Sequence, residues 1–96
     1  MNHLYLQLGR AIAAQCPPGF KEARLEAAPD EGKLVIACTL EDGGEVKPAL
    51  GEPARHAILA ALGEVREAMA AQDGKPWRSC TVTLVAGGGF AMDVAD

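Results

Sequence analysis

The sequence is short of basic charge and of residues that carry out covalent catalysis. Nine Lys and Arg stand against thirteen Asp and Glu, which gives a net charge of −4. Binding to nucleic acid without sequence preference depends on clustered cations, so nucleic acid is not an expected partner and a basic or neutral protein fits better. The only serine is Ser79, and the histidines are His3 and His56. These are too few for an activated nucleophile beside a base, and neither histidine belongs to a zinc-binding pattern. We therefore expect a protein that is not an enzyme and holds no cofactor or metal ion.

Long apolar runs and paired cysteines are absent as well. No run approaches the roughly 20 residues of a membrane-spanning helix, and the first residues lack the basic region and apolar stretch of a secretion signal. These absences predict a cytoplasmic protein without a membrane partner. Cys16, Cys38 and Cys80 are odd in number and widely spaced, with no C-x-x-C pair. This spacing argues against a disulfide framework and a thiolate metal site. We expect reduced thiols, with Cys38 and Cys80 as small buried side chains.

What the sequence does contain is a pattern of two helices. The chain has 96 residues, 49% of them apolar, which is enough for one compact domain over residues 1–96 and too little for two. Leu4, Leu8 and Ile12 repeat at the spacing of an amphipathic helix over residues 2–16. A second helix is predicted from residue 51 to residue 72, because Pro53 suits a first helical turn. Gly74 and Pro76 are expected to end it.

Five segments alternate between apolar and polar residues as strands do. They are residues 20–27, 33–41, 45–50, 78–86 and 90–95. Pro48 has no amide hydrogen, so the third strand is expected at a sheet edge. Because each strand has one apolar side, the chain predicts an α+β two-layer sandwich with both helices on one face of an antiparallel sheet. The predicted order is α-β-β-β-α-β-β.

Hairpin loops of fixed length predict the register of these strands. A loop over residues 29–32 sets Leu25 opposite Ile36. A loop over residues 42–44 sets Leu40 opposite Val46. The glycine run 87–89 is interpreted as a third loop, since a strand follows it where a phosphate-binding loop needs Lys and a helix. That loop sets Leu84 opposite Met92 and keeps Phe90 on the inner side.

The other face of the predicted sheet is left open and is the candidate partner-binding surface. Parity places small uncharged side chains on it, bordered by Glu22, Glu26, Glu41 and Asp93 beside Arg24. Apolar contact there would supply affinity to a partner with a basic rim, while the charges would raise the association rate. The same residues also suit an ordinary solvated face or a contact between two copies of the chain. Trp77 and Phe90 are expected to be structural, with Trp77 mostly buried.

Four stretches in the last third of the sequence form a distinctive set: Glu64-Val65-Arg66-Glu67-Ala68-Met69, Gly74-Lys75-Pro76-Trp77, Cys80-Thr81-Val82-Thr83-Leu84 and Gly88-Gly89-Phe90-Ala91-Met92-Asp93-Val94. Together they resemble the YezG-like immunity-protein family. Its members have a helix ending in an L-R-E-like turn, a P-W pair, a T-x-T-L strand and a D-G-K-F-x-I-D-F-x-Y-D hairpin. Two later aromatics of the family correspond to Val94 and Ala95, so the chain resembles a divergent, shortened member.

The resemblance implies a bacterial cytoplasmic immunity protein, or antitoxin. Such a protein would bind a cognate polymorphic toxin of the LXG type, often a nuclease, and block it stoichiometrically. An acidic inhibitor facing a basic nuclease would also gain electrostatic steering. The alternative is a self-associating structural or adaptor domain without enzymatic activity, with a second copy of the chain as partner. A small enzyme using Cys80 or Cys16 is the least favoured interpretation.

Overall fold

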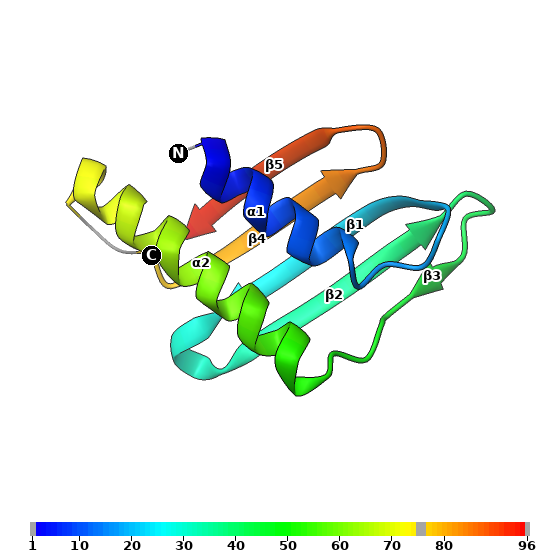
Figure 1. Ribbon diagram of the computed structural model, residues 1–96, viewed down its shortest axis with the longest axis horizontal. Helices are drawn as coiled ribbons and strands as arrows, with labels where there is room; N and C mark the ends of the chain where they lie inside the picture. The colour runs from blue at the N-terminus through cyan, green and yellow to red at the C-terminus, as the bar shows by residue number, and fades with distance from the viewer. Residues whose placement is uncertain (1, 75–76, 96) are drawn as a thin grey trace.

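The computed structural model describes residues 2–74 and 77–95 (Figure 1). Its described elements follow the predicted order of an α+β protein. They are α1 (Asn2–Ala13), β1 (Phe20–Ala28), the 3-10 turn η1 (Pro29–Glu31), β2 (Lys33–Leu40), β3 (Glu45–Val46), α2 (Glu52–Asp73), β4 (Ser79–Val85) and β5 (Gly89–Ala95). Neither of the helices in this part of the chain has the length and apolar character needed to cross a membrane.

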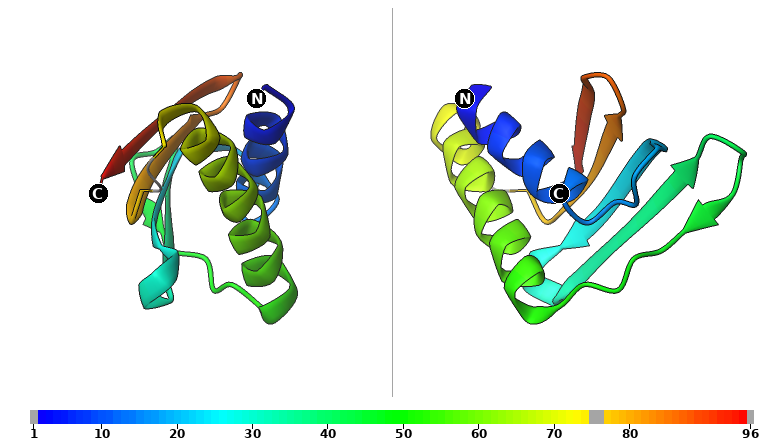
Figure 2. Two further views of the ribbon diagram at one scale, coloured as in Figure 1. Left: turned by 90° about the vertical axis from the view of Figure 1, so that its left-hand side faces the viewer. Right: turned by 45° about the vertical axis from the view of Figure 1, so that its right-hand side comes forward.

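The described strands form one antiparallel sheet with both helices on one side. The strand order is β3-β2-β1-β4-β5, so β1 is central and β3 and β5 are edges. Figure 2 shows α1 and α2 together against the same face, while no described element covers the other face. The predicted two-layer sandwich is confirmed. β3 lies at an edge as expected, but it contains residues 45 and 46 only, and Pro48 follows it.

The two helices form where the apolar spacing predicts, with a correction at the end of α1. Leu8, Ile12, Ile58, Leu62 and Val65 are all fully buried beneath them. α1 ends at Ala13 and not at Cys16, because the next amides turn back in tighter bonds, such as that from Gln15 N–H to Ile12 O at 3.0 Å. α2 ends as predicted at Gly74, whose φ is +78°. Pro76, the other expected stop, lies outside the described residues.

The register of the first hairpin is confirmed, and the registers of the other two differ from prediction. Leu25 pairs with Ile36. In the second hairpin Cys38, and not Leu40, pairs with Val46. In the third hairpin Leu84 pairs with Phe90 and not with Met92. Both registers move by an even number of residues, so the inward and outward sides of the strands stay as predicted.

Glycine geometry explains both shifts. A common three-residue hairpin loop needs a left-handed backbone at its last position and tolerates ordinary residues before it. Gly43, with φ +89°, occupies that last position in the second hairpin. In the third hairpin Gly87 and Gly88 both have positive φ, +100° and +120°, so that loop uses two left-handed glycines and Gly89 begins β5. The loops are therefore residues 41–43 and 86–88, each starting one residue earlier than predicted. Glu41 consequently lies in a loop, although the prediction placed it in a strand.

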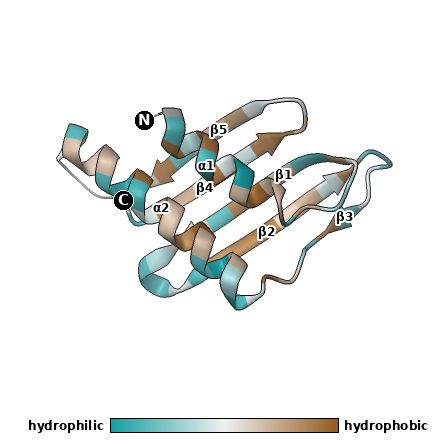
Figure 3. Ribbon diagram, in the orientation of Figure 1, coloured by the Kyte–Doolittle hydropathy of each residue, from teal (hydrophilic) through white to brown (hydrophobic). Residues whose placement is uncertain are grey.

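The core lies between the helices and the inner face of the sheet. Figure 3 shows apolar residues in both helices and in the strands of the sheet, and the buried apolar cluster draws its members from both layers. Cys38 and Cys80 are buried in it, as expected. Trp77 is 2% exposed, so its predicted burial is also confirmed. It lies at the corner before β4, with the Arg66 guanidinium 5.7 Å from its ring centroid. Arg66 in turn donates to both carboxylate oxygens of Asp30, at 3.1 and 3.0 Å.

Candidate partner-binding surfaces

The open face of the sheet can be mapped from the strand registers. Directly paired residues point to the same side, so three rows of side chains cross the face, and Lys33 paired with Ala28 lies beyond them on the same side. The middle row contains Ala37, Arg24, Thr83 and Ala91. The flanking rows contain Val35, Glu26, Thr81 and Asp93 on one side, and Glu45, Thr39, Glu22 and Val85 on the other. The face therefore presents small side chains with charged residues between them.

Part of this face is hollowed into a basin of about 400 Å³. It is lined by residues of the β1–β2–β3 half of the sheet: Glu22, Arg24, Glu26, Val35, Ala37, Thr39, Glu45 and Lys47. Two of the predicted residues, Glu22 and Glu26, line it together. Asp93 lies on the same face two strands away, across Thr81 from Glu26. Glu41 lies outside the basin, in the exposed loop between β2 and β3.

Glu45 and Lys47 are basin residues that the sequence analysis missed. Glu45 pairs with Thr39 and therefore lies on the open face. The alternation of apolar and polar residues in the third strand already predicted this side for Glu45. Lys33 adds a further cation to the face, with Nζ 4.0 Å from Glu26 Oε2. The face is therefore mixed in charge, with Lys33 and Lys47 present in addition to the predicted Arg24. The acids are densest near the β2–β3 loop, where Glu41 and Asp42 adjoin Glu22 and Glu45.

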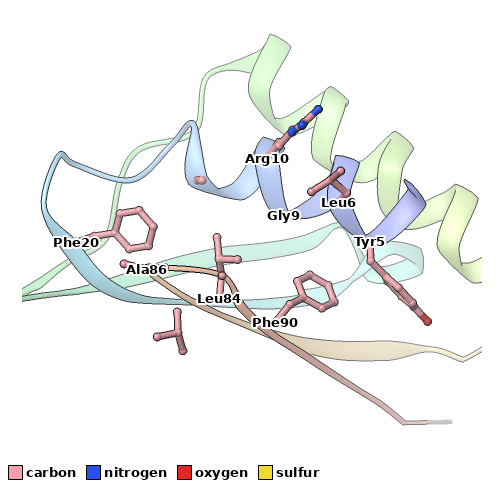
Figure 4. A pocket seen from close by; sticks show the side chains of 12 residues that line it. Tyr5, Leu6, Gly9, Arg10, Phe20, Leu84, Ala86 and Phe90 are labelled. Atoms are coloured by element: carbon pink, nitrogen blue, oxygen red, sulfur yellow. The ribbon is translucent and has the colours of Figure 1, made fainter. Parts of the chain in front are cut away.

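A second hollow, of about 480 Å³, lies between α1 and the β4–β5 hairpin (Figure 4). Its lining is largely apolar: Tyr5, Leu6, Gly9, Arg10, Ala13, Phe20, Leu84, Val85, Ala86, Gly87, Gly88 and Phe90. Leu6 is 55% exposed. The rings of Tyr5 and Phe90 lie 5.5 Å apart. Phe90 thus packs against Tyr5 of α1 and is partly buried against the core.

Two local features create this hollow. Gly9 lies in the middle of α1 and has no side chain to fill the space above Leu84 and Phe90. A register irregularity between Phe20 and Glu22 then places Phe20 opposite Leu40, on the helix side of the sheet. Without this bulge, Phe20 would share the open face with Glu22. The sequence pattern did not indicate the bulge, so the hollow was not predicted.

The described residues contain no cluster of three or more His, Cys, Asp or Glu that could hold a metal ion. His3 and His56 are both exposed. Comparison with protein-family models finds no match to the chain, and a search of curated proteins finds none either. The two surfaces are therefore described by their own chemistry.

Proposed function

We propose that the protein is a bacterial immunity protein that binds a toxin protein one to one and blocks it, using the open face of its sheet. The observation that carries the proposal is this uncovered face, whose middle row contains the small side chains of Ala37, Thr83 and Ala91 together with Arg24. Small side chains allow another protein to approach closely, and the charges among them orient the partner. An inhibitor of this kind needs no chemistry of its own.

The position of the family-like motifs supports the proposal. In the strand that resembles T-x-T-L, the alternate residues Thr81 and Thr83 lie on the open face, while Val82 is fully buried. In the hairpin that resembles the family's, Asp93 lies on the open face. The motif residues are thus divided between the core and the candidate contact surface.

Electrostatics favours a toxin with a basic surface. The chain carries a net charge of −4. Glu22 and Glu45 lie on the open face beside the loop that holds Glu41 and Asp42. The electric field of such an acidic surface raises the association rate of an oppositely charged partner, and salt weakens this effect. The cations Arg24 and Lys47 lie within the same basin and would select a partner that also presents carboxylates.

The test is binding to the protein encoded beside this chain. The wild type should form a 1:1 complex with it, and co-expression should rescue growth. Thr83→Trp adds bulk at the centre of the open face and should weaken binding by at least about 100-fold, close to 2.7 kcal/mol. In the same assay Glu22→Lys should slow association and reduce its dependence on salt. Isothermal calorimetry and stopped-flow fluorescence measure the two effects.

Ala60→Trp is the matched control, because Ala60 is exposed on α2 in the opposite layer. It should bind as the wild type does, and circular dichroism should show both variants folded. Equal affinities for Thr83→Trp and Ala60→Trp would remove the open face as the contact surface. Absence of any complex at micromolar concentration would refute the immunity function itself.

The edge strand β5 favours self-association as a second candidate function. β5 is an edge of the described sheet over residues 89–95, and Asp93 is its only charged side chain. Val94 is 41% exposed. Edges of this kind accept a further strand unless charge or proline blocks them. Light scattering at high concentration distinguishes the two candidates, since a strictly monomeric protein excludes this one.

A further inference from the structure

Two of the three cysteines, distant in sequence, meet in the structure. Cys16 follows α1, and its Sγ lies 3.2 Å from Sγ of Cys38 in β2. The Cys38 thiol donates to Cys16 Sγ, and the Cys16 thiol donates to Ile12 O at 3.4 Å. A disulfide bond is about 2.05 Å long, so the two sulfur atoms need to approach by only about 1 Å to be joined.

We propose that Cys16 and Cys38 are a disulfide-forming pair that a peroxide oxidises. In the first step Cys16 sulfur attacks the peroxide, the O–O bond breaks, and Cys16 becomes a sulfenic acid with release of water. In the second step Cys38 sulfur attacks Cys16 sulfur and a second water leaves. In total, two thiols and one hydrogen peroxide give one disulfide and two waters, with the thiols oxidised by two electrons and the peroxide reduced.

The burial of the two thiols assigns their order of reaction. Cys38 is 0% exposed, so an oxidant in solution cannot reach it first. Cys16 is half-buried and lies in the segment between α1 and β1. Burial raises the pKa of Cys16, and the neighbouring Cys38 thiol, which would share the site with a second negative charge, raises it further, to about 12, so the reactive thiolate of Cys16 is scarce at neutral pH. The pair is therefore a slowly formed structural link and not a fast peroxide sensor.

Cys80 is excluded from the pair by the sheet register. Cys38 in β2 pairs with Ala23 of β1, and Cys80 in β4 pairs with Ala27 of β1. The two cysteines therefore lie in the two strands that flank β1, four residues apart along it. Four residues along a strand span about 13 Å, which no disulfide can bridge. Cys80 therefore serves as an internal reference thiol.

The bond would tie the segment after α1 to the sheet. That segment connects Ala13 to Phe20, and both residues line the apolar hollow. A cross-link between residues 16 and 38 closes a loop of moderate length, which restricts the unfolded chain. The melting temperature of the oxidised protein should rise by about 10 °C or more.

The experiment treats the intact protein with hydrogen peroxide, then unfolds it, alkylates the remaining thiols and digests it with trypsin. The three cysteines fall in separate tryptic peptides, because Lys21, Lys33 and Arg78 lie between or beside them. The expected product links the peptides of Cys16 and Cys38, leaves Cys80 alkylated, and has the higher melting temperature. Cys80→Ala should form the same link.

Cys16→Ser is the negative control and keeps the buried Cys38 in place. It should form no internal link, and its melting temperature should not rise with peroxide. A link to Cys80, a cross-linked dimer, or oxidation of Cys16 to sulfinic acid without a link would each overturn the proposal. Three alkylated thiols in the fully treated wild type would overturn it as well.

Discussion

Trp77 is a large buried side chain that connects the core to Arg66 on α2. Its ring is buried and touches the Arg66 guanidinium, which in turn holds Asp30 in the β1–β2 turn. Trp77→Ala should lower the free energy of unfolding by roughly 3–5 kcal/mol, because it removes a large buried side chain and leaves a cavity. Urea denaturation measures this change.

Trp77→Phe is the matched control. Among the described residues, Trp77 Nε1 has no hydrogen-bond partner, so phenylalanine loses little besides volume. It should retain most of the stability. A melting temperature for Trp77→Ala equal to that of the wild type, together with loss of partner binding, would assign Trp77 to an interface.

Asp30 makes stability depend on pH. Its hydrogen bonds and proximity to Arg66 hold the pKa of the Asp30 carboxyl below the ordinary value of 3.8. The folded state thus binds the Asp30 proton more weakly than the unfolded state does, so the stabilisation is complete above about pH 5 and is lost as pH falls through the ordinary value of 3.8 and then through the folded pKa. Asp30→Asn should melt below the wild type at pH 7, and the difference should shrink as pH falls below about 5. A constant difference from pH 7 to pH 2 would contradict this account.

At the scale of elements, α1 contains a glycine that the packing does not require. A Cβ atom on Gly9 would lie 3.7 Å from Leu84 Cδ1 and 3.8 Å from Phe90 Cδ2, which are ordinary contacts. Gly9→Ala should therefore raise the free energy of unfolding by about 0.5–1 kcal/mol through helix propensity, and further through these contacts. Thermal denaturation measures the gain.

Gly63→Ala in α2 supplies the comparison. A Cβ atom there meets nothing within 4 Å, so this variant reports helix propensity alone. Gly9→Ala should stabilise the protein at least as much as Gly63→Ala. A loss of stability in Gly9→Ala, with a gain in Gly63→Ala, would mean that α1 lies closer to the hairpin than the structure has it.

The elements also show how far sequence reasoning reaches. The spacing of apolar residues predicted both helices and the inward side of each strand, because burial of one face is what determines that spacing. Two hairpin registers were missed, because the position of the left-handed glycine within the loop decides them and a run such as residues 87–89 offers several choices. The alternation of apolar and polar residues gave no sign of the bulge at the start of β1. The position of Phe20 on the helix side of the sheet, and the apolar hollow that it lines, were therefore not predicted.

At the scale of the whole molecule, contacts between distant segments limited the prediction of sites. Alternation predicted Glu22, Glu26 and Asp93 on the open face, where the registers place them. The contact between Cys16 and Cys38 depends on the course of the segment after α1 relative to β2. The spacing of the cysteines in the sequence does not indicate that course, so the contact was not predicted.

The central place of β1 has a consequence for the order of assembly. Its partner β2 follows within a few residues, but its other partner, β4, is synthesised only after the whole of α2. Pairing of β1 with β4 closes a long loop of chain. Such distant pairings form late in folding, because the chain loses conformational entropy before the contacts between the two strands compensate for the loss. During translation, β1 therefore keeps a vacant edge until β4 leaves the ribosome, and in that interval the nascent chain is most exposed to mispairing and to chaperones.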